Sequence, residues 1–483
     1  MAEDEFHDFV GNSDSEDEEF LGFNLDEIRD DIEQGDVDGE IKLNEDEIAE
    51  IMREVDEEMY REERDPTLDA YECNWLRDFT EQPGPRHIDE NASEYDIFSK
   101  IVNEEIISLL MEETNILPAA TAKGFTTLMS RDRFLNILAY FHAADNDLEP
   151  PRESPNYDPT YKFSKLARLL IRNWQRYYCP HREMSTDETL IPFKGRTKFI
   201  QYIPSKPHKW GLKVWTLAES KTGYMYNWEM YTGKQAATND ARGIAHRVVI
   251  NICSPIVDKG YHLYYDNYFS SPALFRELCD KQIGACGTLR TNRVGVPAVV
   301  KTAKPPKGES IVHRDGRFLY ISFMDKRLVN VITTVHNGST YTKRVRSRFH
   351  ENHFREVEHP MAIQLYTKYM GGVDSADQQT QYCVTQHRML KWWKKLVLCS
   401  LLEISFCNAK ILWKHFNPGM RKYCSNNFRL AVISGLLEGY ERQNNKKFVR
   451  PAANPPSRMT ERHFPSLNPS ITPGGRRSNP DCE

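Results

Sequence analysis

The chain of 483 residues lacks several patterns that would assign it to a class at once. Its ten cysteines form no C-x-x-C pair, and the acidic N-terminus has no apolar segment of a secretory signal, so we expect reduced thiols in a cytosolic or nuclear protein. No apolar run approaches the roughly 20 residues that span a bilayer. Even "LVLCSLLEISF" is short and carries Glu403, and we therefore expect a soluble intracellular protein with no membrane contact.

Basic residues are scarce at the N-terminus. Residues 1–66 hold 28 Asp/Glu and 5 Lys/Arg, a net charge of −23, whereas the remaining 417 residues hold 42 acids and 58 bases, a net charge of +16. Acidic runs such as "DSEDEEF" cannot bury enough apolar surface to offset the entropy of ordering. The sequence predicts a disordered acidic tail over 1–66, which either solubilises the basic body, shields it from polyanions or contacts a partner.

The body begins with helical periodicity and continues with strands. Apolar residues at helical spacing in "DIFSKIVNEEIISLLMEETN" and "YKFSKLARLLIRNWQRYYC" predict a helical part over 86–180. From 181 to 289, short runs rich in Thr, Ile, Val, Tyr and Trp predict strands, followed by a helix at 240–253, the strand "HLYYD" and a further helix. This order is typical of a mixed sheet covered by helices.

The second half predicts three further parts. Residues 290–360 have a basic, β-like pattern and are expected to form a β-rich insertion. A long helical region returns from 374 to about 416. The end, 441–483, has seven prolines and eight bases against four acids, which predicts an irregular basic tail.

Three aspartates stand at informative places. Asp187 lies inside the strand-like run "STDETLIPF", where carboxylates are depleted, so it either faces solvent on an edge strand or serves a site. Asp266 ends the apolar strand in "HLYYDNYF". It either belongs to a turn with Asn267 or serves a site, because sites in open α/β sheets form at the carboxyl ends of strands. Asp374, after two glycines in "KYMGGVDSADQQ", is either a helix cap or a metal ligand.

Carboxylates on a first strand, a later strand and a subsequent helix can converge at one edge of a sheet, although 79 and 108 residues separate them here. Such a cluster repels itself unless cations neutralise it, and oxygen-only ligands select hard ions such as Mg²⁺ or Mn²⁺. Two such ions about 3.5–4 Å apart support in-line displacement at phosphorus. The basic body then has a phosphate backbone as its natural partner.

Several blocks of the chain resemble piggyBac transposases and piggyBac-derived proteins, in the right order and over roughly residues 124–415. The blocks are "STDETLIPFKGRTKFIQYIPSKPHKWGLKVWTLAESKTGYMY", "YYDNYFSSPALFRELCDKQIGACGTLRTNR" and "YMGGVDSADQQTQYCVTQHRMLKWWKKLVLCSLLEISFCNAKILW". The resemblance implies a mixed α/β fold with an RNase H-like (DDE/DDD transposase) core in two parts, 181–289 and 361–381. It also implies a catalytic, metal-binding triad of Asp187, Asp266 and Asp374, supported by Asp377.

The resemblance implies cut-and-paste transposition of double-stranded DNA at TTAA sites with two Mg²⁺ or Mn²⁺ ions, a homodimer, a nuclear location and no small-molecule cofactor. The helical parts 86–180 and 382–440 are then expected to serve dimerisation and DNA binding. Candidate phosphate contacts near the core and on the late helix are Lys206, Lys209, Lys213, Arg388, Lys391, Lys394 and Lys395. The alternative for the first three is solvated lysine on strands, and Trp392 and Trp393 are predicted to pack in the core.

Two departures from the family bear on activity. After "EETN", which ends at Asn115, the long helical segment that the family usually carries is missing, and the sequence stops just after Cys482, before the cysteine-rich zinc domain of the family. We therefore expect no zinc, and loss or delegation of end-sequence recognition. Three functions stay open: an active transposase or nuclease, a catalytically silent DNA- or chromatin-binding protein on a transposase-derived core, and a protein-interaction scaffold.

Overall fold

The computed structural model describes residues 75–115, 137–204, 206–233, 243–346, 354–381, 391–420 and 423–437. The chain divides into two compact units, Met1–Ala70 and Tyr71–Glu483, and every described residue belongs to the second. The predictions for the acidic tail 1–66, for the segment directly after Asn115, for Arg388 and for the tail 441–483 therefore fall outside the described residues.

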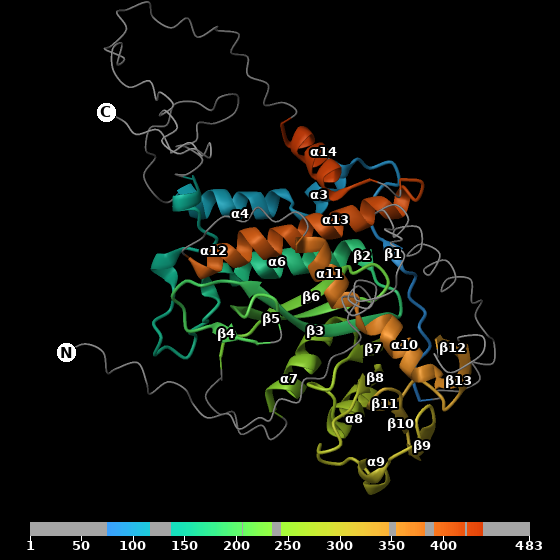
Figure 1. Ribbon diagram of the computed structural model, residues 1–483. Coiled ribbons are helices and arrows are strands. Elements are labelled where there is room, and N and C mark those ends of the chain that lie inside the picture. Colours follow the sequence, from blue (N-terminus) through green and yellow to red (C-terminus); the bar gives the residue numbers. More distant parts are fainter. Residues whose placement is uncertain are drawn as a thin grey trace, which may run out of the picture. The chain divides into compact units, whose positions relative to one another are not determined.

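A mixed β-sheet is the central element of the described residues (Figure 1). It has nine strands there, eight of them in the order β4-β5-β3-β7-β8-β11-β10-β9, while β6 pairs with β5. The strands are β3 Glu183–Pro192, β4 Ile200–Tyr202, β5 Trp210–Glu219, β6 Met225–Met230, β7 His262–Tyr265, β8 Gly284–Thr288, β9 Ser310–Asp315, β10 Phe318–Met324 and β11 Leu328–Thr333.

Five strands of this sheet, paired in the order β6-β5-β3-β7-β8, have the arrangement of an RNase H-like core. Strands β3, β5 and β6 form an antiparallel meander, and β7 and β8 add in parallel on the other side of β3. Helix α7, Gly243–Ile252, lies in the connection from β6 to β7, and helix α8, Pro272–Asp280, lies between β7 and β8. The predicted mixed α/β fold with an RNase H-like core is confirmed.

The stretch 290–360 is rich in strands, as predicted, but three of its strands extend the central sheet. Strand β11 pairs antiparallel with β8, where Val331 lies opposite Thr288, and β10 and β9 follow outward. Strands β12, Thr340–Arg346, and β13, Phe354–Pro360, form a separate two-stranded ribbon. The chain then returns to the core through helices α10, Met361–Met370, and α11, Gly372–Gln381.

The remaining elements lie mostly before β3 and after α11. Short strands β1 and β2 pair with each other. The elements are β1 Gly84–Pro85, α3 Glu94–Ile101, α4 Glu104–Asn115, η2 Asn146–Leu148, α6 Tyr161–Tyr177, β2 Tyr178–Cys179, η3 Ser254–Ile256, α9 Ala298–Thr302, α12 Trp392–Leu396, the π-helix η4 Val397–Leu401, α13 Leu402–Phe416 and α14 Ser425–Leu437.

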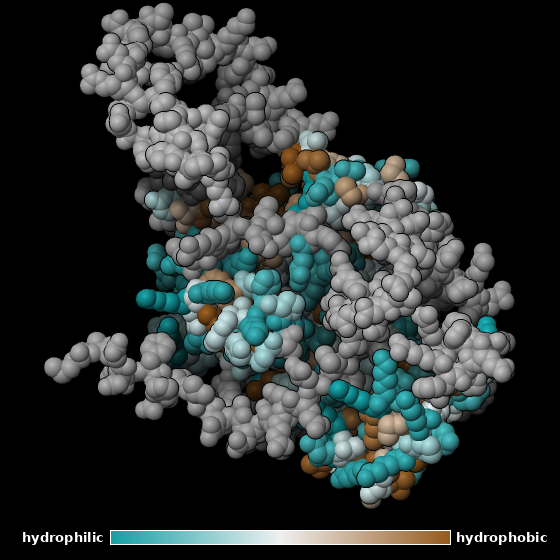
Figure 2. Space-filling view, in the orientation of Figure 1, coloured by the Kyte–Doolittle hydropathy of each residue, from teal (hydrophilic) through white to brown (hydrophobic). Residues whose placement is uncertain are grey.

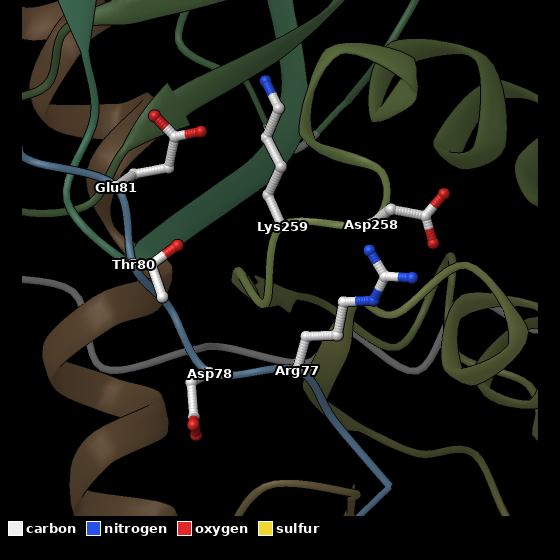
Figure 3. A pocket seen from close by; sticks show the side chains of 6 residues that line it. All are labelled: Arg77, Asp78, Thr80, Glu81, Asp258 and Lys259. Atoms are coloured by element: carbon white, nitrogen blue, oxygen red, sulfur yellow. The ribbon is translucent and has the colours of Figure 1, made fainter.

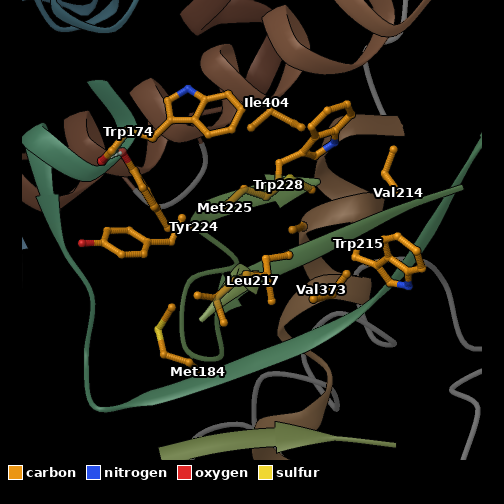
Figure 4. Packing of buried hydrophobic residues seen from close by; sticks show 14 of the residues in the cluster. Trp174, Met184, Val214, Trp215, Leu217, Tyr224, Met225, Trp228, Val373 and Ile404 are labelled. Carbon is orange, nitrogen blue, oxygen red and sulfur yellow. Dashed lines mark hydrogen bonds between the residues drawn. The ribbon is translucent and has the colours of Figure 1, made fainter. Parts of the chain in front are cut away.

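One apolar cluster joins the helices to the sheet (Figure 4). Trp174 of α6 and Leu217 of β5 are fully buried in it, and the Trp174 Nε1 donates a hydrogen bond of 3.1 Å to Ser405 of α13. Val373 of α11 and Met184 of β3 are fully buried in the same cluster. Val373 therefore anchors the start of α11 in the core beneath the sheet face that carries Asp187.

By length and composition, the helical stretch Trp392–Phe416 is long and apolar enough to cross a membrane, which the sequence had not led us to expect of any segment. It has 25 residues, but 61% of its apolar window is buried inside the protein, as in a core helix. Helix α14, by contrast, exposes Leu430, Ile433 and Leu436, and Figure 2 shows this region as a brown area.

Candidate active site

Strand β3 and helix α11 are locked together on either side of Asp187. Side chains two residues apart on a strand share a face, so Ser185, Asp187 and Thr189 point to the same side of β3. The Thr189 hydroxyl donates to both carboxylate oxygens of Asp377 on α11, at 2.8 Å each. A Cβ atom added to Gly372 would lie 2.4 Å from the Ser185 hydroxyl. Asp187 thus lies between two close contacts with the helix that carries Asp374.

Asp374 lies in the first turn of α11, two residues inside its start at Gly372. The carboxylate is therefore not at the cap position that the sequence offered as one alternative. Acidic side chains in the first turn are stabilised by the positive end of the helix dipole. The side chain of Asp374 is exposed, whereas Val373 beside it is fully buried, so the helix is anchored while this carboxylate stays accessible.

Asp266 directly follows β7, as predicted. Because β7 runs parallel to β3, with Ser185 opposite Tyr264, its carboxyl end reaches the part of β3 that carries Asp187. The backbone N–H of Tyr268 donates to Asp266 Oδ1 at 2.9 Å, which fixes the carboxylate in a tight turn. Asp266 can therefore belong to a turn and still serve a site, so the two alternatives offered by the sequence do not exclude each other.

Two arginines after β8 hold this turn from the neighbouring strand. The Arg290 Nε donates to Asn267 Oδ1 at 2.9 Å. The Arg293 guanidinium donates to the backbone carbonyls of Asn267 at 3.2 Å and of Tyr268 at 2.7 Å. Since Asp266 lies next to these anchored residues, its position depends on both arginines.

Burial and the charges of neighbouring carboxylates raise the pKa values in this cluster. Burial, together with the charges of Glu188, Asp266 and Asp374, raises the pKa of Asp187 well above its ordinary value. Burial and Glu188 raise the pKa of Asp266 to about 6. Burial, with a contribution from Asp374, raises the pKa of Asp377 to about 7 although Thr189 donates to it. The site thus disfavours the charged forms of these carboxylates when no cation is bound.

The structure brings Lys206 into this cluster. The lysine belongs to the loop between β4 and β5, and its Nζ donates to the backbone carbonyl of Glu188 at 3.2 Å. Burial lowers its pKa, but the negative charges of Asp187, Glu188 and Asp374 outweigh burial and raise the pKa above its ordinary value. Lys206 is therefore a fixed positive charge beside the carboxylates.

Comparison with known proteins identifies the family of this arrangement. A family model described as Transposase IS4 matches residues 118–410. The human PiggyBac transposable element-derived protein 3 is 27% identical over 372 residues, which cover 72% of this chain and 58% of that protein. The chain belongs to the piggyBac transposase family. The human PiggyBac transposable element-derived protein 2 is 25% identical over 290 residues, 55% of this chain and 46% of that protein.

The cryo-EM structure of the piggyBac transposase synaptic complex with hairpin DNA has the same fold. It superposes with a TM-score of 0.64 at 22% sequence identity, and covers 82% of this chain and 91% of that chain. This piggyBac-family chain spans about half the length of these human relatives, 58% of the first and 46% of the second.

The other lysines proposed as phosphate contacts have different surroundings. The Nζ of Lys213 lies 3.6 Å from Glu188 Oε2 and 4.8 Å from the ring centroid of Tyr268. Lys209 and Lys391 are exposed, and Lys395 is half-buried. The Lys394 Nζ donates to the backbone carbonyls of Leu138 and Ala139 at 2.7 Å each. DNA binding by these lysines stays a prediction.

The late tryptophans pack in the core, as predicted. Trp393 is 5% exposed. The ring of Trp392 meets the rings of Phe163 and Phe199 edge-on, with centroids 5.8 Å and 5.0 Å apart. Trp393 is thus buried and Trp392 is partly buried against the core cluster, as packing residues are.

Divalent cations suit the donor set of this piggyBac-family site. Across the described ranges, no group of three or more His, Cys, Asp or Glu side chains is arranged to hold a metal ion as it stands. The carboxylates of Asp187, Asp266, Asp374 and Asp377 nevertheless supply oxygen ligands only, with repulsion that a cation relieves. These side chains therefore fit Mg²⁺ or Mn²⁺ in the chemistry of their ligand atoms.

A polar pocket of about 380 Å³ lies elsewhere (Figure 3). It is formed by the segment before β1 and the loop before β7, and it is lined by Arg77, Asp78, Thr80, Glu81, Asp258 and Lys259. Charges of both signs line it, and Glu81 is paired with Arg86. None of the carboxylates of the candidate active site takes part in this pocket.

Sequence reasoning missed several residues of the site. Glu188 and Thr189 follow Asp187 on β3, and the alternation of strand side chains would have placed Thr189 on the same face as Asp187. Arg290 and Arg293 follow β8, the strand next to β7, and this position at the carboxyl edge was the available signal. The same alternation places Glu188 on the opposite face of β3, so the strand pattern gave no signal that its charge acts on Asp187.

Proposed function

We propose that this protein is a piggyBac-type DNA transposase, or a nuclease-competent descendant, with a catalytic triad of Asp187, Asp266 and Asp374. The observation that carries the proposal is the approach of these side chains from β3, from the end of β7 and from α11. Together with Asp377 they would hold two Mg²⁺ or Mn²⁺ ions. The reaction would be phosphodiester cleavage and strand transfer at TTAA sequences.

The metal ions would supply Lewis acidity for the phosphate and a lowered pKa for the attacking water. The chain's own residues hold the ligands in place. Thr189 orients the Asp377 carboxylate with its hydroxyl, and the Tyr268 N–H orients that of Asp266. The guanidinium groups of Arg290 and Arg293 keep the turn after β7 in one position.

Double-stranded DNA is the proposed partner. The net charge of +16 over residues 67–483 gives a sequence-independent attraction to a phosphate backbone. The similar solved structure is a transposase complexed with hairpin DNA, which supports the same partner here. Action as a homodimer and a nuclear location complete the proposal.

Cleavage of a labelled DNA with terminal TTAA repeats, with Mg²⁺ or Mn²⁺, tests the proposal. The unmodified chain should cut this DNA, and Asp374→Asn should abolish cutting because a neutral amide is a poorer ligand for a hard cation. Asp315→Asn is the matched control, because this exposed aspartate lies at the end of β9, outside the site. Equal cutting by all three proteins would refute the triad.

A second candidate is a catalytically silent DNA- or chromatin-binding protein on the same core. Lys206 favours it, because an ammonium group beside the carboxylates already supplies positive charge without a metal ion. This function predicts salt-sensitive DNA binding without cleavage at any Mg²⁺ or Mn²⁺ concentration. Binding should then be equal for the unmodified chain and for Asp315→Asn, and cleavage by the former would exclude this candidate.

A further inference from the structure

One segment beside the site is positively charged throughout. Residues 189–218 contain six Lys or Arg and no Asp or Glu. They form the end of β3, the edge strand β4, the following loop and most of β5. Four of the six basic side chains are exposed: Lys194, Arg196, Lys198 and Lys209. This edge of the sheet therefore attracts polyanions.

An exposed aromatic pair lies within this segment. Tyr202 of β4 and Trp210 of β5 are opposite one another in the antiparallel register. Their ring centroids are 4.7 Å apart at an interplanar angle of 49°, and each residue is 50% exposed. Trp210 is the one tryptophan among the exposed large apolar side chains of the described residues. A pair that served core packing alone would be buried, as Trp174 is.

The aromatic pair is connected directly to the acidic cluster. Tyr202 and Trp210 flank the loop that carries Lys206, and the Ile203 N–H donates to the Lys209 carbonyl at 2.8 Å to close this loop. Lys206 reaches back from the loop to the Glu188 carbonyl on β3. A strand bound along this loop would therefore extend from the aromatic pair to the carboxylates.

We propose that Tyr202 and Trp210 form a stacking platform for unpaired bases of a DNA strand that passes the acidic site. Every base has a π-face, so such stacking tolerates any sequence, and the four exposed basic side chains would follow the phosphates. Bases inside a duplex are already stacked on their neighbours, so the platform selects unpaired nucleotides. The inference rests on the proposed function for its ligand, DNA, and adds a single-strand contact to it.

Binding of a labelled oligothymidine, measured by fluorescence anisotropy with the full chain at low salt and without divalent ions, tests the platform. Trp210→Ala should weaken this binding about 5- to 150-fold, which corresponds to the loss of one stacked base. Trp210→Phe should retain most of the affinity, because phenylalanine still offers a ring. Binding of a fully paired duplex should change little in either variant.

Tyr140→Ala is the matched control, since Tyr140 is 46% exposed and lies in the helical part outside the platform. It should bind both DNA forms as the unmodified chain does. Thermal melting of each variant verifies that it is folded. Because Tyr202 and Trp210 are half-exposed, truncating either side chain should leave the fold intact.

Oligothymidine binding unaffected by both Trp210→Ala and Tyr202→Ala would overturn the platform, as would an equal loss for single strand and duplex. Because no metal is present, the result is independent of cleavage. A Trp210-dependent single-strand affinity in a protein that never cuts DNA would keep the platform and reject the transposase activity. Absence of any DNA binding would reject both.

Discussion

Replacing Gly372 with alanine tests whether the close approach of α11 to the sheet positions the third carboxylate. An added Cβ would lie 2.4 Å from the Ser185 hydroxyl, 2.9 Å from the Ser220 Cα and 3.0 Å from the Glu219 carbonyl oxygen. The hydroxyl can rotate away, but the two backbone atoms cannot. Restoring an ordinary separation of about 3.5 Å requires the start of α11 to shift by roughly 0.5 Å.

The neighbouring Gly371 provides the control. No atom lies within 4 Å of a Cβ added there, and its φ of −79° suits alanine. Gly371→Ala should leave stability unchanged or raise it by up to about 1 kcal/mol through a less flexible unfolded chain. Overpacking at Gly372 costs about 1–3 kcal/mol. Because both substitutions share the unfolded-state gain, the difference between the two variants isolates the steric cost.

Urea unfolding of both variants measures this difference, and we expect Gly372→Ala to be less stable than Gly371→Ala by about 1–3 kcal/mol. Asp374 follows two residues later and moves with the helix, so cleavage should fall by about one order of magnitude. Adding Ser185→Ala should recover only part of the loss, because the backbone contacts remain. Equal unfolding free energies for the two glycine variants would refute the reasoning.

Three further predictions concern pH and salt. Burial raises the pKa of Glu219, but hydrogen bonds from His181 and Thr222 outweigh burial and keep the pKa below 4.5. The carboxylate therefore stabilises the fold above pH 4.5, and this stabilisation is lost as the pH falls below 4.5. The free energy of unfolding in urea should depend less on pH below 4.5 in Glu219→Gln than in the unmodified chain, and an equal dependence would contradict the reasoning. Burial lowers the pKa of His336 to about 3, so this residue lowers the free energy of unfolding as the pH drops from 6.5 toward 3. His336→Gln should remove this contribution, so its unfolding free energy should fall less steeply between pH 6.5 and 4.5 than that of the unmodified chain, and an equal slope would contradict the reasoning. Lys209→Ala should reduce the slope of log affinity for duplex DNA against log salt concentration by about 1, because an exposed phosphate contact is lost. Lys394→Met loses hydrogen bonds to two backbone carbonyls, so it should lower the melting temperature and leave the slope unchanged. Equal slopes for both variants and the unmodified chain would exclude a Lys209 phosphate contact.

Local patterns in the sequence were sufficient to locate two of the three carboxylates. Asp187 interrupts a run of strand-forming residues and Asp266 ends one, and both features are visible without tertiary structure. The position of Asp374 relative to the helix start could not be read from the sequence, because the two glycines allow the helix to begin on either side of them.

Tertiary contacts decided what the patterns could not. Lys206 was grouped with Lys209 as a phosphate contact because both are bases in one loop, and only the fold of that loop over β3 brings Lys206 to the carboxylates. The strand pattern after residue 290 predicted β-structure correctly, but period-two alternation does not reveal the sheet that a strand joins. Arg290 and Arg293 gain their roles from the neighbouring strand in the same way.

The long excursion between β8 and α10 affects the order in which the protein can mature. Domains form progressively as a chain is synthesised, and contacts between distant residues form late. When β8 has emerged, Asp187 and Asp266 are already present, but Asp374 follows only after strands β9 to β13. An unfinished chain that ends between β8 and α11 carries two of the three acids, so synthesis itself delays assembly of the full cluster until most of the protein exists.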